Sequence, residues 1–159
     1  MALPRRFPAL AAVAAVMLGG ASSPAPRVDY PEGFRHWTHV TSGVNGQGHG
    51  PYEGMYHIYA NAKAVRGYRT GRFPDGAQIV FDLHEARQTG AVTQPGTRRF
   101  VDVMQKDMKR FRSTDGWGYE KFAEGDPQKR RLPSEAMTRC HSCHVAQQSA
   151  DFVISRLRD

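Results

Sequence analysis

The chain has 159 residues, a formal net charge of +7 and an apolar fraction of 40%, which is enough to bury one hydrophobic core. Acidic residues interrupt the basic ones throughout, without the like-charge blocks or aromatic–basic ladders typical of nucleic-acid binding. We therefore expect a single domain that binds no nucleic acid.

The N-terminal segment is typical of a secretory signal peptide. Arg5 and Arg6 form a basic start, an apolar run covers 9–18, and small residues follow as far as Ala21. The apolar run is shorter than the roughly 20 residues that span a bilayer, although an uncleaved anchor is the alternative interpretation. We expect residues 1–21 to be removed on export.

Export predicts a periplasmic protein with no membrane span after processing. Residues 22–29 are rich in Ser, Pro and Ala at their start and are expected to form a linker. The folded domain is then expected to cover residues 30–159.

Residue patterns along the domain predict strands with short helices between them. Aromatic and β-branched residues indicate strands, and a Pro-Asp-Gly turn precedes one in which Ile79, Phe81 and Leu83 share a face. The expected strands are 34–42, 55–60, one within 73–86, 97–106 and 117–122. A glycine-rich loop is expected over 43–54 and a basic surface loop over 126–133.

Capping residues predict two helices. Asn61 can cap a helix over 62–70 that Gly71 ends, and Ser134 can cap a second helix that runs to about residue 149. Strands with interspersed short helices and a terminal helix indicate an α+β domain with a mostly antiparallel sheet.

Both cysteines of the chain lie in one short motif, Cys140-His141-Ser142-Cys143-His144. A zinc site needs about four ligands, and a second cysteine pair is missing. A thioredoxin-type pair normally belongs to a βαβ unit, which the expected elements lack. A disulfide across so small a ring would stabilise the fold little.

Covalent haem attachment uses both cysteines of the motif and its last histidine. The thiols of Cys140 and Cys143 would add to the two vinyl groups of a porphyrin, and His144 would ligate the iron as its metal-binding residue. Export suits a c-type haem, which is attached outside the cytoplasm. We predict one covalent haem c per chain.

The residues alone do not decide whether the iron has a sixth ligand on the side opposite His144. Met55, Met104, Met108 and Met137 are available as a sixth ligand, as are several histidines. An axial methionine would make an electron-transfer cytochrome, whereas an open position would make a gas binder or an enzyme. Fifteen residues follow His144 and none is Met or His, which disfavours the small electron carriers.

Longer stretches of the chain resemble the cytochrome P-460 family, and most closely its cytochrome c′-beta branch. They are YPEGFRHWTHV, HIYANAKAVRGYRTGRFPDGAQIVFDLHEA, DVMQKD, TDGWGYEKF and the late CHSCH…DFV. The resemblance implies an exported c-type cytochrome with a mostly antiparallel β fold and an open distal face on its haem. It also implies a homodimer and a diatomic gas ligand. It does not decide whether the cytochrome has a redox partner protein.

The two branches of that family differ at one position. The P-460 enzymes oxidise hydroxylamine and bond a lysine to the porphyrin edge, whereas c′-beta proteins lack the bond and bind nitric oxide or carbon monoxide under aromatic rings. Counting from Asp75 of the Asp-Gly turn places Phe81 at the lysine position, and a phenyl ring cannot form the bond. Lys63 and Lys106 do not match that position and are expected to be solvated.

The resemblance implies Phe81 and Tyr52 as members of a cap of rings beside the haem. From the residues alone, the favoured interpretation of Phe81 is a core phenylalanine with Ile79 and Leu83. Tyr52 stands where relatives usually have phenylalanine; its phenol would hydrogen-bond a gas if it points inward and would be an ordinary loop tyrosine if it points outward. We expect a five-coordinate gas-binding cytochrome without catalytic residues, with a hydroxylamine-oxidising enzyme or an electron carrier as alternatives.

Overall fold

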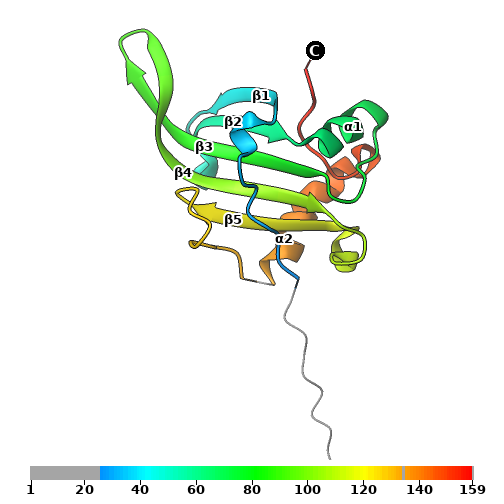
Figure 1. Ribbon diagram of the computed structural model, residues 1–159. Coiled ribbons are helices and arrows are strands. Elements are labelled where there is room, and N and C mark those ends of the chain that lie inside the picture. The colour runs from blue at the N-terminus through cyan, green and yellow to red at the C-terminus, as the bar shows by residue number, and fades with distance from the viewer. Residues whose placement is uncertain (1–25, 134, 159) are drawn as a thin grey trace, which may run out of the picture.

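A computed structural model describes residues 26–133 and 135–158 (Figure 1). Five strands form one antiparallel sheet in the order β1-β2-β3-β4-β5, so each strand pairs with its neighbours in sequence. The strands are β1 (Thr38–Asn45), β2 (Gly54–Ala60), β3 (Gln78–Thr89), β4 (Val92–Lys106) and β5 (Trp117–Ala123). Together with two short α-helices this confirms the predicted α+β class.

The first strand differs from its expected bounds at both ends. Residues Phe34–His36 form a 3₁₀ turn, η1, because Gly33 adopts a left-handed φ of 68° and the Phe34 ring is buried. β1 then continues to Asn45, which pairs with Gly54. The expected glycine-rich loop is therefore shorter than predicted, and it contains the 3₁₀ turn η2 (Gly50–Tyr52).

β3 and β4 continue into a long hairpin that extends beyond the body of the sheet (Figure 1). Thr89 pairs with Val92 across a turn in which Gly90 adopts a φ of 60°. The expected fourth strand began at residue 97, because the polar side chains before it lack the apolar alternation of a half-buried strand. Most residues of this extension are exposed, so it is recognised as a hairpin by the pairing of its two strands and not by burial.

The predicted caps of the first helix are confirmed. In α1 (Ala62–Thr70), the Asn61 side chain accepts from the Ala64 N–H at 2.9 Å, and Gly71 ends the helix with a φ of 75°. The second helix, α2 (Ala136–His144), ends at the motif and continues as the 3₁₀ helix η4 (Val145–Ala150). The predicted cap Ser134 lies outside the described residues.

The two faces of the sheet are covered by different parts of the chain. The N-terminal segment crosses one face, whose buried cluster comprises Val28, Phe34, Val80, Val101, Val103, Phe111 and Phe122 (Figure 1). The opposite face, here called the helix-side face, packs against α1, α2 and the C-terminal segment. Its buried cluster includes Ile58, Ala60, Val65, Phe73, Ile79, Trp117, Tyr119, Phe152 and Val153.

Candidate functional site

The motif lies on α2, which packs against β5 at the edge of the sheet (Figure 1). Residues three and four apart share one side of a helix, so Cys140, Cys143 and His144 point in related directions. Both thiols are free; Cys140 is half-buried and Cys143 is exposed. Cys140 contacts the helix-side cluster, which places this thiol at the sheet.

The hydrogen bond of His144 fixes which of its ring nitrogens can bind a metal. Nδ1 lies 2.9 Å from the carbonyl oxygen of Phe152, and a carbonyl can only accept, so Nδ1 carries the proton. Nε2 is therefore the nitrogen with a free lone pair. Burial lowers the pKa of His144, and the hydrogen bond to Phe152 offsets part of this shift. The lowered pKa favours the neutral imidazole, which is the form that binds iron.

A second histidine of the motif was not singled out from the sequence. His141 is buried; its Nε2 donates to the Asp115 carboxylate at 2.9 Å, and its Nδ1 accepts from the Tyr119 hydroxyl at 3.0 Å. The Tyr119 ring in turn lies 5.1 Å from the His144 ring. The sequence signal for His141 was its position between the two cysteines of a helix, because one side of that helix must face the core.

Four aromatic rings gather on the helix-side face. Phe81 stacks on Tyr56 at 5.1 Å and meets the edge of Tyr52 at 5.9 Å, while Tyr52 meets Phe100 at 5.4 Å. We call Tyr52, Tyr56, Phe81 and Phe100 the ring cluster. Phe81 is partly exposed instead of sealed in the core, and Tyr52 is 39% exposed, so these rings present apolar surface.

The hydroxyl of Tyr52 points along the sheet to a carboxylate. It donates to Asp102 at 3.0 Å, and the Lys121 ammonium lies 2.8 Å from the same carboxyl group. Lys121 also lies 3.1 Å from the centroid of the Phe100 ring. Burial raises the pKa of Asp102 and lowers that of Lys121, and each opposes the shift of the other.

Electrostatic effects connect this pair to the motif. Burial raises the pKa of the Cys140 thiol, the Asp102 carboxylate raises it further, and the Lys121 ammonium lowers it. The two thiols likewise contribute to the raised pKa of Tyr52, after burial and Asp102. The motif, the ion pair and Tyr52 therefore share one region of the molecule.

The methionines lie in different places. Met104 is on β4 and packs against the helix-side cluster, whereas Met55 is one residue out of phase with Tyr56 and faces the other side of β2. Met108 is 50% exposed, and Met137 contacts both buried clusters.

The expectation that Lys106 is solvated is wrong. Its side chain is buried and pairs with Asp151 at 2.8 Å, 45 residues further along the chain. Lys106, the last residue of β4, faces the core because the C-terminal segment covers it. Lys63 is exposed and donates to the Asp75 carbonyl at 3.0 Å.

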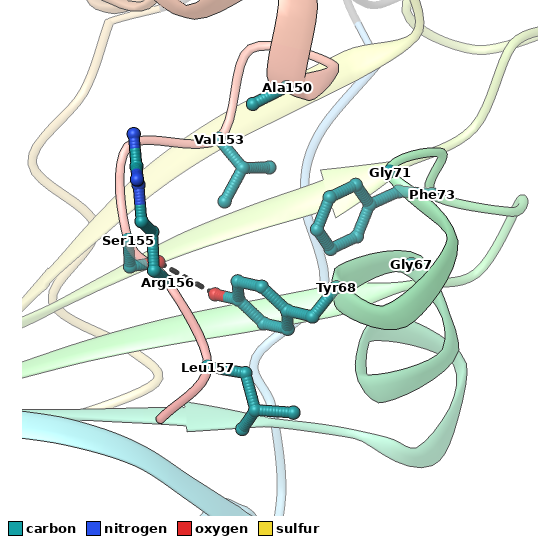
Figure 2. Close-up of a pocket in the computed structure, with 9 residues that line it drawn as sticks. All are labelled: Gly67, Tyr68, Gly71, Phe73, Ala150, Val153, Ser155, Arg156 and Leu157. Carbon is teal, nitrogen blue, oxygen red and sulfur yellow. Dashed lines mark hydrogen bonds between the residues drawn. The ribbon is translucent and has the colours of Figure 1, made fainter. Parts of the chain in front are cut away.

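A cavity of about 230 Å³ lies between α1 and the C-terminal segment, away from the motif (Figure 2). Tyr68 lines it, and its hydroxyl hydrogen-bonds to Ser155 at 2.6 Å.

None of the helices formed by residues 26–133 and 135–158 is long and apolar enough to cross a membrane. Within the same ranges, no group of three or more His, Cys, Asp and Glu side chains is arranged to hold a metal ion.

An antiparallel sheet packs against a helix that bears two free thiols and an oriented imidazole, which is a set of groups able to bind a haem. The family model of cytochrome P460 matches residues 31–155, so the chain belongs to the cytochrome P460 family. A search of the curated proteins finds no match.

The residues present fit a haem group. Two unpaired thiols three residues apart could bond the porphyrin, and Nε2 of His144 is the nitrogen left for the iron. The ring cluster offers partly exposed apolar surface against which a macrocycle could pack.

Proposed function

We propose that this protein is an exported c-type cytochrome of the c′-beta kind, with one haem per chain bound through Cys140 and Cys143. His144 ligates the iron, and the opposite face stays open for nitric oxide or carbon monoxide beside Phe81 and Tyr52. A ferrous haem supplies the site at which such gases bind. The observation that carries the proposal is the Nδ1 hydrogen bond of His144, which leaves Nε2 free next to two free thiols.

The ring cluster would determine which ligands reach the iron. Bulky rings raise the steric cost of a distal ligand and exclude water, which favours five-coordinate iron. The single proton of the Tyr52 hydroxyl is donated to Asp102, so it is not available to a bound gas. Dioxygen needs a polar donor for stabilisation, and we therefore expect it to bind poorly.

An optical spectrum of the ferrous protein tests this function. A high-spin spectrum that changes on addition of carbon monoxide is the expected result. A low-spin spectrum that does not change on addition of carbon monoxide would instead indicate a six-coordinate electron carrier. The spectrum of Met104→Leu would then show whether Met104 is the sixth ligand.

One observation favours the hydroxylamine-oxidising enzyme as second candidate. Phe81, Asp102 and Lys121 lie opposite one another on β3, β4 and β5, so a lysine shares the face of Phe81 two strands away. Burial lowers the pKa of Lys121, which makes its amine a better nucleophile than an exposed lysine. Its ion pair with Asp102 opposes this effect.

Mass spectrometry of the proteolysed haem peptide distinguishes the two candidates. The gas-binding proposal expects haem bonded to the Cys140–Cys143 peptide and to no lysine peptide. A third bond to the Lys121 peptide would favour the enzyme. Sedimentation of the purified protein would test the homodimer that we also expect.

A further inference from the structure

The carbonyl group that orients His144 is held by an unusual backbone conformation. Asp151 and Phe152 adopt φ values of 52° and 65°, in the left-handed region that residues with a Cβ rarely occupy. Such a conformation persists where the surrounding structure holds it in place. The surroundings of Asp151 therefore determine where the Phe152 carbonyl lies.

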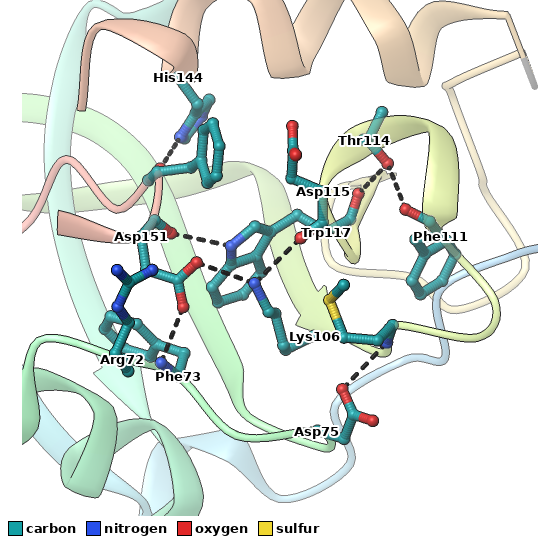
Figure 3. A network of polar contacts seen from close by, with 12 residues as sticks. Arg72, Phe73, Asp75, Lys106, Phe111, Thr114, Asp115, Trp117, His144 and Asp151 are labelled. Carbon is teal, nitrogen blue, oxygen red and sulfur yellow. Dashed lines mark hydrogen bonds and ion pairs between the residues drawn. The ribbon is translucent and has the colours of Figure 1, made fainter. Parts of the chain in front are cut away.

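Three separate elements hold Asp151 (Figure 3). Its Oδ1 accepts from the Lys106 ammonium of β4 at 2.8 Å, and its Oδ2 accepts from the Phe73 N–H at 2.8 Å. Its backbone carbonyl accepts from Nε1 of Trp117 on β5 at 2.8 Å. These contacts attach the segment next to His144 to the end of the sheet.

Lys106 is fixed as firmly as its partner. It also donates to the Asp115 carbonyl at 3.0 Å, and its ammonium lies 5.0 Å from the centroid of the Trp117 ring. Lys106 and Asp151 are each 6% exposed. A buried ion pair costs desolvation and often adds little net stability, whereas it can specify one geometry strictly.

We propose that the Lys106–Asp151 pair positions the iron ligand by holding the Phe152 carbonyl against Nδ1 of His144. This inference rests on the proposed function, in which His144 ligates the haem iron. A carbonyl that accepts the proton of Nδ1 makes Nε2 more basic and strengthens its bond to the metal. Lys106 and Asp151 are positioning residues, since they act through Phe152.

The test is resonance Raman spectroscopy of the ferrous holoprotein, because the iron–histidine stretching band reports the strength of that bond. Asp151→Asn removes the charge but keeps the shape, and asparagine tolerates the left-handed conformation. We expect the band to move to lower frequency and to broaden. Trp117→Phe removes the donor to the Asp151 carbonyl and should give a smaller shift in the same direction.

A matched control lies on the surface. Glu124 also has a positive φ, 58°, and pairs with Lys129 at an exposed site. Glu124→Gln should leave the band where it is. If Asp151→Asn does not fold, the Trp117→Phe band alone decides.

Unshifted bands in the folded variants, even with lowered thermal stability, would overturn the positioning role and leave a merely structural pair. A shift equal to that of Glu124→Gln would overturn it as well. Absence of an iron–histidine band in the wild-type protein would instead refute the proposed function, so the two failures are distinguishable.

Discussion

Lys121 and Asp102 form an ion pair of 2.8 Å on the sheet face that carries Phe81, and their side chains are about a fifth to a quarter exposed. The two residues are direct partners in the register of β4 and β5. Phe81 pairs with Asp102 on the other side, so a charged pair lies in line with the ring cluster. The apolar surface proposed for the haem therefore borders a compensated charge and not an isolated one.

Replacing Lys121 by methionine should destabilise the fold, because the Asp102 carboxylate would keep its burial and lose its cation. We expect the free energy of unfolding to fall by about 1–3 kcal/mol, measured by urea denaturation. Lys129→Met at the exposed pair with Glu124 is the control and should leave the midpoint unchanged. Equal midpoints for the two variants would show that the Lys121–Asp102 pair contributes no more than a surface contact.

Truncation of Phe81 to alanine should open the proposed distal side. Removing the ring lowers the steric cost of ligand entry, and we expect carbon monoxide to bind about tenfold faster, which corresponds to about 1.4 kcal/mol of barrier. Stopped-flow mixing measures the rate. Tyr59→Phe on the opposite face of the sheet serves as control, and a Phe81→Ala rate equal to that of the control would remove Phe81 from the distal side.

The Tyr52→Phe substitution separates a bond to the protein from a bond to the ligand. The hydroxyl donates to Asp102, so its loss should lower the free energy of unfolding by about 0.5–1.5 kcal/mol. The dissociation rate of carbon monoxide should stay within about twofold, since no bond to the gas is lost. A much faster dissociation would mean that the phenol contacts the bound gas.

Protonation of His57 should lower the free energy of unfolding of the protein as the pH falls. Burial and the neighbouring His84 lower the pKa of His57 below its usual 6.5. The unfolded chain therefore takes up a proton before the folded one does; the contribution of His57 is fully present above pH 6.5 and is lost as pH falls toward the folded value. Urea unfolding between about pH 5 and 7 measures the slope.

The variant His57→Gln should reduce that slope without removing it, since burial lowers the pKa of His144 as well, and the exposed His36→Gln should leave the slope unchanged. A wild-type slope retained in His57→Gln would assign the pH dependence to other groups. The ring nitrogen of His57 hydrogen-bonds Ser42 at 2.7 Å, and glutamine can replace that contact.

Local signals in the sequence predicted much of this fold. Asn61 and Gly71 define the ends of α1 because caps act within a few residues. The alternation of Ile79 and Phe81 placed both on one face, where the helix-side cluster includes the first and contacts the second. The Phe34 turn was missed, since its burial depends on strands far along the chain.

The candidate site divides in the same way. The motif itself is a local pattern, and it was recognised from five consecutive residues. The partners that orient it are not local: Asp151 meets Lys106 across 45 residues, and Tyr52 meets Asp102 across 50. No periodicity reports such pairs, because their contacts arise from how the sheet and the C-terminal segment pack together.

The most direct measurement of the central claim is the absorption spectrum of the purified, reduced protein before and after carbon monoxide is added. Covalent haem held by His144 with an open opposite face predicts a high-spin spectrum that converts to a carbonyl form, with the colour remaining on the chain after denaturation. A protein without haem, or one whose low-spin spectrum does not respond to the gas, would contradict the account.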